Sequence, residues 1–144
     1  MGEFAIGQPV SRREDPRLLT GRGRYIADIN LPGQAHGVVV RSPHAHALIR
    51  KLDTKDALAA PGVLCILTGA DCVADGLGLL PCDQTHFSRD GSDMYRPPRP
   101  ILVSDRVRLV GDYVAFVVAE TQAQARDAAE LVAVDYEILP AVSA

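Results

Sequence analysis

Two histidines placed two positions apart are the first residues of this sequence that could do chemistry. His44 and His46 would share one face of an extended segment, and a metal ion can use that geometry. No third ligand stands nearby, so a metal site is the weaker interpretation. Ser42 and Pro43 predict a bend here, and we expect the histidines to take part in structural hydrogen bonds around it.

The cysteines offer little more. Cys82 and His86 lie close in the sequence, but no spacing fixes a third partner that would activate a nucleophile. Cys65, Cys72 and Cys82 are odd in number and form no C-x-x-C pair, which favours reduced thiols in a cytoplasmic protein. No Ser/His/Asp arrangement with a supporting motif supports a stand-alone hydrolase. We therefore predict no catalytic residue, no cofactor-binding residue and no metal ligand in this chain.

Arginines gather near the N-terminus, around a predicted one-turn helix that Asp15 caps, Pro16 opens and Gly21 ends. Through Lys51 the chain has eight Lys and Arg against four Asp and Glu, a net charge of +4, and the remainder has seven against fourteen, a net charge of −7. No stacking aromatic residues are interleaved with the arginines, which argues against nucleic-acid binding. We predict a solvated or subunit-interface surface formed by Arg12, Arg13, Arg17, Arg22 and Arg24.

The elements that would position these residues are clearest in the last third of the chain. The continuous apolar run 114–119 is typical of a central strand covered on both faces. Thr121 and Gln124 predict a capping box, and small residues at helical spacing after it predict a helix that covers a sheet. Alternation over 132–139 predicts a second strand. Whether the two strands pair directly or run parallel is left open.

Earlier segments predict further short elements. Residues 36–42 and 47–52 read as a hairpin or a kinked strand pair around Pro43. Asp53 or Thr54 can cap a short helix that follows.

Residues 63–67 predict a buried strand that a turn at 68–71 ends. The Pro-rich segment 76–100 predicts a long loop, of a kind that usually binds something or is mobile. No run reaches the roughly 18 apolar residues that a bilayer-spanning helix needs, so we expect no membrane span.

Four segments, in order, resemble successive motifs of one known domain: residues 12–29, 38–49, 61–71 and 107–142. The domain is the N-terminal α/β-hammerhead of the molybdopterin-binding large subunit in the xanthine dehydrogenase and aldehyde oxidase family, closest in style to carbon monoxide dehydrogenase. The resemblance implies an α+β fold, a mixed sheet with flanking helices. It also implies an N-terminal arm over 1–14 and a single hammerhead domain over 15–144. Tyr113 and Leu48 depart from the family pattern, which often has Pro and Arg there.

The resemblance implies the chemistry of a larger assembly. Such an assembly hydroxylates a carbon centre or oxidises a small substrate, with water as the oxygen source. Electrons pass from molybdenum through two [2Fe–2S] clusters to FAD. In that family the molybdopterin and the catalytic Glu belong to downstream domains, so we expect this chain, as an excised or separately encoded fragment, to be a non-catalytic structural and subunit-contact domain without a cofactor of its own.

The expected partners are the remaining large-subunit domains and the iron–sulfur and FAD subunits or domains. An independent binding or assembly module, which uses the hammerhead fold to hold an iron–sulfur or flavin partner, is the alternative.

Overall fold

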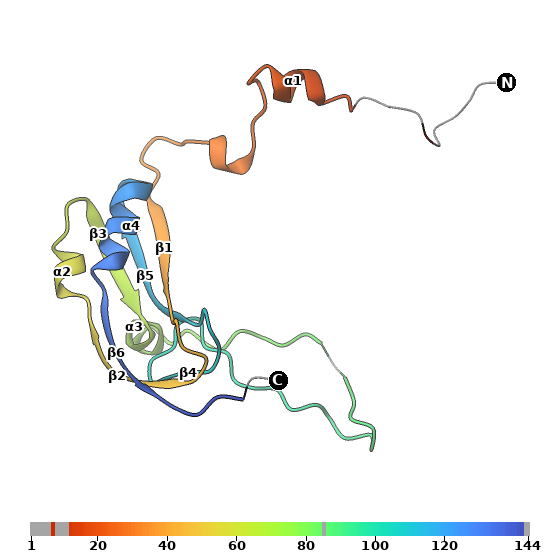
Figure 1. The fold of residues 1–144 in the computed structure, drawn as a ribbon, viewed down its shortest axis with the longest axis vertical. Coiled ribbons are helices and arrows are strands. Elements are labelled where there is room, and N and C mark those ends of the chain that lie inside the picture. Colours follow the sequence, from red (N-terminus) through yellow and green to blue (C-terminus); the bar gives the residue numbers. More distant parts are fainter. Residues whose placement is uncertain (1–6, 8–11, 85, 143–144) are drawn as a thin grey trace. The chain divides into compact units, whose positions relative to one another are not determined.

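The computed structural model describes residue 7, residues 12–84 and residues 86–142, and the chain divides into two units. The first unit extends to Gln34 and the second begins at Ala35. Helix α1 (Asp15–Leu19) and the 3-10 turn η1 (Ile26–Asp28) belong to the first unit, in which none of residues 12–34 is fully buried. All the strands belong to the second unit (Figure 1). The predicted boundary between residues 14 and 15 stays a prediction.

The predicted one-turn helix is confirmed as α1, but its predicted cap is wrong. The helix begins at Asp15 itself, after Glu14, and no side chain bonds the first turn. Pro16 lies in that first turn, where its missing N–H costs nothing. Gly21 has φ of +70° just past the end, the left-handed conformation that glycine adopts without strain.

Sheet A is a three-stranded antiparallel sheet in the order β1-β5-β3. Its strands are β1 (His36–Arg41), β5 (Tyr113–Ala119) and β3 (Val63–Thr68). The central position predicted for the apolar run 114–119 is therefore confirmed. The prediction that β3 is buried is wrong, because none of its residues is fully buried and Leu64 is 55% exposed. β3 is an edge strand, and only one of its faces meets the core.

Sheet B is also three-stranded and antiparallel, in the order β4-β2-β6. Its strands are β4 (Arg106–Val107), β2 (Ala47–Asp53) and β6 (Ala133–Ile138). The chain changes sheet between β1 and β2, so the prediction of a hairpin is wrong. The alternative, two successive strands with a kink between them, is what the structure has. β5, α4 and β6 follow one another as expected, but β6 pairs with β2 in the other sheet. The α+β class with flanking helices is confirmed, with two antiparallel sheets as its β component.

Helix α4 (Gln122–Glu130) lies along β1 and β5 on one face of sheet A (Figure 1). Ala125 and Ala128 on this helix are fully buried, as their helical spacing predicts. Small residues let the helix axis lie close to the sheet. Ala128 belongs to a buried cluster that contains Ala57, Ala115, Val117, Ala128 and Val132.

A second buried cluster is formed where sheet B meets the start of β5. Leu52 and Val134, both from sheet B, pack against the two clusters and so connect them. The second cluster contains Ala47, Val103, Val107 and Val114.

The N-terminal ends of three helices test the caps that the sequence predicts. Thr121 accepts a hydrogen bond from the N–H of Gln124, but its hydroxyl donates to the Gln124 side chain, so half of the predicted capping box is present. A complete box is found instead between Thr68 and Asp71, where the sequence predicts only a turn. It begins α3 (Gly69–Ala74). The short helix α2 (Lys55–Leu58) follows Asp53, whose carboxylate accepts from the Lys55 N–H as predicted.

In the parts of the chain that are described, no helix is long and apolar enough to cross a bilayer.

Candidate functional site

The predicted arginine surface lies entirely in the first unit. Arg12, Arg13, Arg17, Arg22 and Arg24 are all exposed. Arg12 forms an ion pair with Asp15 at 3.6 Å, and with its side chain 81% exposed this pair contributes little. The structure thus keeps these arginines on one exposed segment, as the sequence predicts, and leaves their role as a subunit interface a prediction.

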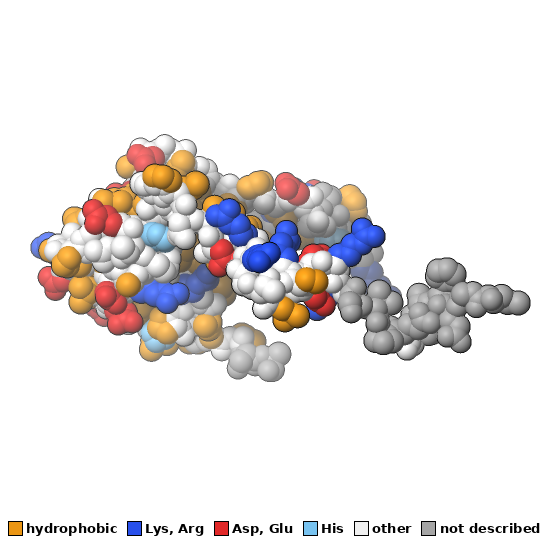
Figure 2. Space-filling view, turned by 90° about the horizontal axis from the view of Figure 1, so that it is seen from above, with side chains coloured by type: hydrophobic (Ala, Val, Ile, Leu, Met, Phe, Trp, Pro, Cys, Tyr) orange, Lys and Arg blue, Asp and Glu red, His pale blue; other side chains and the backbone are white. Residues whose placement is uncertain are grey.

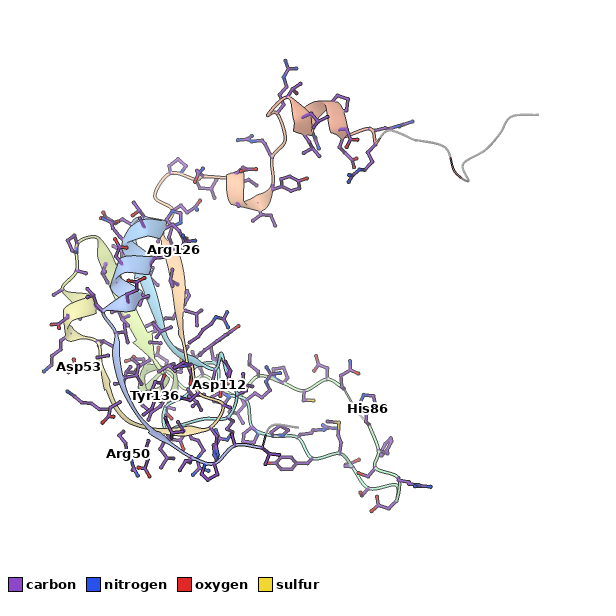
Figure 3. All side chains as sticks on the ribbon, viewed as in Figure 1. Arg50, Asp53, His86, Asp112, Arg126 and Tyr136 are labelled. Carbon is purple, nitrogen blue, oxygen red and sulfur yellow. The ribbon has the colours of Figure 1, made fainter. Side chains whose placement is uncertain are left out.

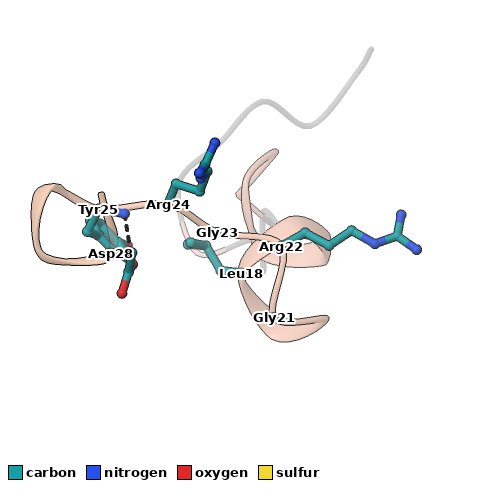
Figure 4. A pocket seen from close by; sticks show the side chains of 7 residues that line it. All are labelled: Leu18, Gly21, Arg22, Gly23, Arg24, Tyr25 and Asp28. Atoms are coloured by element: carbon teal, nitrogen blue, oxygen red, sulfur yellow. Dashed lines mark hydrogen bonds between the residues drawn. The ribbon is translucent and has the colours of Figure 1, made fainter. Parts of the chain in front are cut away.

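A hollow of ≈ 690 Å³ opens beside two of these arginines (Figure 4). Asp28 accepts a hydrogen bond from the Tyr25 N–H at 3.0 Å on one side, and Leu18 packs on the backbone of Gly23 on the other. The side chains of Arg22 and Arg24 point in different directions rather than toward one another. This hollow has no convergent set of charged groups, and we assign no ligand to it.

His44 and His46 are separated by their surroundings. The Ser42 Oγ accepts from the His44 N–H at 3.0 Å and lies 3.1 Å from the His44 carbonyl oxygen, to which it donates. The His44 ring packs edge-on against Tyr136, with 5.0 Å between centroids. The Nδ1 of His46 lies instead 2.8 Å from the carbonyl oxygen of Pro140. The structural hydrogen bonding predicted around the bend is confirmed.

The other candidates for chemistry lie apart. His86 belongs to the long loop, away from the labelled Tyr136 and Asp112 (Figure 3). Its carbonyl accepts from the Met94 N–H at 3.1 Å, and Phe87 pairs with Asp93 to form a small hairpin. Within the described ranges no three His, Cys, Asp or Glu side chains stand close enough to hold a metal ion together. Cys65, Cys72 and Cys82 are free thiols, as predicted.

Two carboxyl groups whose pKa is lowered in this structure belong to a helix cap and a turn. Hydrogen bonds from the Thr68 hydroxyl and N–H lower the pKa of Asp71. Hydrogen bonds from Ser92 lower the pKa of Asp90 in the same way.

An exposed ion pair and one partly buried phenol account for the remaining pKa shifts. A hydrogen bond between the Lys51 ammonium and the Asp53 carboxylate, 2.9 Å apart, raises the pKa of Lys51 and lowers that of Asp53. Burial raises the pKa of Tyr136. Among the described residues, the shifted carboxylates and Lys51 bond within a cap, a turn or a single strand. Acid–base catalysis typically uses titratable groups that face one another in an enclosed cleft.

Sequence reasoning missed the second face of sheet A. Ala115 and Val117 point to α4, so Phe116 and Val118, which alternate with them, lie on the other face. Val39 and Leu67 pair with Phe116, and Cys65 pairs with Val118. We call the set Val39, Cys65, Leu67, Phe116 and Val118 the open sheet face.

The open sheet face is only partly covered by the described residues. Leu67 is 40% exposed, and the other four side chains are partly buried. The ring of Phe116 lies over Gly37, where a Cβ would come within 2.3 Å of it. The apolar run 114–119 predicted cover on both faces; the structure supplies a helix on one. Elsewhere on the surface, Figure 2 shows hydrophobic side chains interspersed with charged ones.

The fold and its sequence match a known family. A model described as the aldehyde oxidase and xanthine dehydrogenase a/b hammerhead domain matches residues 20–140. The chain belongs to this family. The resemblance of its four motifs to the hammerhead domain is thereby confirmed.

Related proteins place this hammerhead domain within longer chains. It is 44% identical over 137 residues to the nicotine 6-hydroxylase large subunit of Paenarthrobacter nicotinovorans, a match that covers 95% of this chain and 16% of the relative. It superposes on quinoline 2-oxidoreductase from Pseudomonas putida 86 with a TM-score of 0.75 and 45% identity, covering 99% of this chain and 17% of that one. It superposes on a Cu,Mo-CO dehydrogenase with a TM-score of 0.76 and 38% identity, covering 96% of this chain and 16% of that one. The chain therefore spans about a sixth of the length of these proteins.

Proposed function

We propose that this hammerhead domain is a structural and subunit-contact domain in the large subunit of a molybdenum hydroxylase, and that it is not catalytic alone. Its relatives are named as a hydroxylase large subunit, an oxidoreductase and a Cu,Mo-CO dehydrogenase, and each is about six times longer than the matched region. The observation that carries the proposal is the open sheet face, an apolar surface on sheet A that the described residues cover only in part and over which they place no helix.

Exposed apolar surface on a folded sheet marks a place where another element binds. The open sheet face combines aromatic, aliphatic and thiol side chains, the composition of a domain core rather than of a solvated surface. We infer that another domain of the large subunit packs on it.

The first unit supports the same conclusion. Leu19 is 85% exposed, Ile26 is 90% exposed and Leu31 is 66% exposed, although each is strongly apolar. A five-residue helix such as α1 is too short to be stable by itself in water. We propose that these side chains and the five predicted arginines contact a partner, because apolar anchor residues and arginines are typical of protein interfaces.

The metal and cofactor chemistry of such an assembly is proposed for other chains and domains. A [2Fe–2S] cluster takes four cysteine ligands, and this chain has three cysteines in total. The described residues also present no metal-ligand cluster. We therefore propose that molybdopterin-bound molybdenum is held by the remaining large-subunit domains and that [2Fe–2S] and FAD are held by partners. The free thiols favour a cytoplasmic assembly.

Thiol footprinting tests the contact role. In the 144-residue chain, Cys65 on the open sheet face should react with a maleimide, as should the exposed Cys82. In the complete large subunit the reactivity of Cys65 should fall at least tenfold, because a neighbouring domain covers it. Equal reactivity of Cys65 in both proteins, measured by mass spectrometry, would contradict the proposal.

Metal analysis and co-expression separate the two functions considered. The purified chain should contain no stoichiometric molybdenum and should show no dehydrogenase activity. A stable complex between this chain alone and an iron–sulfur or flavin protein would favour the independent binding module instead.

A further inference from the structure

A groove in the second unit brings three arginines together with apolar side chains. It is a hollow of ≈ 630 Å³. Arg41 comes from the end of β1, Arg99 from the end of the long loop and Arg108 from the turn between β4 and β5. We call this hollow the arginine groove. Its apolar lining includes Leu80, Ile101, Leu109, Val110 and Tyr113, which are between 38% and 64% exposed.

The positive charges of the groove are not neutralised by the described part of the chain. The guanidinium of Arg41 lies 4.5 Å from the centre of the Tyr113 ring and donates to the Gly111 carbonyl at 3.3 Å. Arg108 donates from Nη1 to the Arg106 carbonyl at 3.3 Å. Among the described residues neither of these arginines, nor Arg99, forms an ion pair. By contrast, Arg50 outside the groove is paired with Glu137.

Asp112 is the one carboxylate among the described residues that line the groove, and it already has partners. Asp112 accepts hydrogen bonds from the N–H groups of Arg108 at 2.6 Å and Leu109 at 3.2 Å, which closes the turn between the strands. It lowers the net charge of the groove without pairing with a guanidinium. Two of the three positive charges therefore remain in excess.

Both walls of the groove are held by backbone hydrogen bonds. On one side the Leu80 N–H donates to the Arg99 carbonyl at 2.8 Å, which closes the base of the long loop. On the other side the Gly111 N–H donates to the Ser42 carbonyl at 2.8 Å. Gly111 has φ of +90°, so glycine is needed for that wall. A groove that is formed in advance loses little entropy when a ligand binds.

We propose that the arginine groove binds an acidic segment of a partner polypeptide, in which an apolar side chain lies between carboxylates. Guanidinium groups pair with carboxylates through two parallel hydrogen bonds, and the exposed apolar lining can cover the side chain between them. The chain after Lys51 has a net charge of −7 although it includes Arg99 and Arg108, so the positive groove contrasts in charge with the remainder of that region. This inference goes beyond the proposed function, because it concerns a different surface and requires no cofactor.

A peptide-binding measurement tests this proposal on the 144-residue chain. The probe is a short rhodamine-labelled peptide in which Glu alternates with Leu, and the control is the same peptide with Gln in place of Glu. Fluorescence anisotropy should show saturable binding of the Glu peptide, at least tenfold tighter than the Gln peptide. Binding should weaken as salt is raised, because the ion pairs are screened.

Matched arginine variants locate the site. Arg99→Gln and Arg108→Gln should each weaken binding of the Glu peptide about fivefold or more. Arg126→Gln, on the exposed side of α4 and outside the groove, should leave it unchanged. Among the described residues the side chain of Arg99 makes no hydrogen bond, and its carbonyl, which accepts from the Leu80 N–H, is kept in Arg99→Gln. Arg99→Gln therefore keeps the test valid if Arg108→Gln fails to fold.

Three results would overturn the proposal. The Glu and Gln peptides could bind equally, which would make the groove a purely apolar surface. Arg126→Gln could weaken binding as much as Arg99→Gln, which would make the attraction nonspecific. Single-stranded DNA could bind more tightly than the Glu peptide and with the same sensitivity to Arg99, which would identify a nucleic-acid site.

Discussion

The two faces of sheet A are formed by alternate residues of the same strand, β5, and they end in different environments. On one face Ala115 and Val117 are fully buried beneath α4, whose own contact residues are alanines. On the open sheet face Phe116 and Val118 are larger or equal in size and are only partly covered. The contrast shows that α4 closes one face of sheet A, whereas the described residues cover the other face only in part.

Overpacking the α4 interface should have the largest effect on stability. Ala128→Leu places a larger side chain where α4 lies against the sheet, so the free energy of unfolding should fall by about 3 kcal/mol. Ala123→Leu, on the exposed side of the same helix, is the control and should change stability by less than about 0.5 kcal/mol. Urea unfolding of both variants measures the difference. Equal losses of unfolding free energy in the two variants would mean that α4 does not pack on sheet A through Ala128.

A pair of truncations in β5 compares the two faces directly. Val117→Ala removes buried methyl groups and should cost about 2 kcal/mol of unfolding free energy, including the cavity it leaves. Val118→Ala, one residue along on the open sheet face, should cost less than about 1 kcal/mol in this chain. If the two losses were equal, the open sheet face would already be closed by the chain itself.

The cap of α4 should have an intermediate effect on the closed face. Thr121→Ala removes the hydroxyl that accepts from the Gln124 N–H, and we expect a loss of about 1 kcal/mol in unfolding free energy. Thr121→Ser retains the hydroxyl and should recover most of that loss. Thermal unfolding followed by circular dichroism checks both variants; a Ser variant as unstable as the Ala variant would argue against capping.

The smallest effect is expected from the cap of α3, and it should depend on pH. Because hydrogen bonds from Thr68 lower the pKa of Asp71 in the folded state, this carboxylate stabilises the fold above its ordinary pKa of about 4. That contribution should disappear as the pH falls through the lowered pKa. The stability difference between the natural chain and Asp71→Asn, measured by urea unfolding, should therefore shrink between pH 6 and pH 2. A difference that stayed constant over this range would contradict the assignment.

Local signals were sufficient for most of the secondary structure. The start of α4 at Thr121 and its buried alanines could be predicted because capping and helical periodicity involve residues that are neighbours in sequence. The exposure of the arginine segment could be predicted from its charge. The complete cap between Thr68 and Asp71 was missed, although its spacing is the same as that of Thr121 and Gln124.

Sequence by itself determined most of the extended and helical segments of this chain, although not α3 or β4, and the family that it resembles. Only the tertiary structure decided that β5 and β6 belong to different sheets, because strand pairing depends on partners far along the chain. It alone assembled the arginine groove, since Arg41, Arg99 and Arg108 come from three separate segments. A continuous apolar run indicates that both faces of a strand are suited to burial, but it does not indicate which element covers each face. In sheet A one face is covered by α4 and the other is left open.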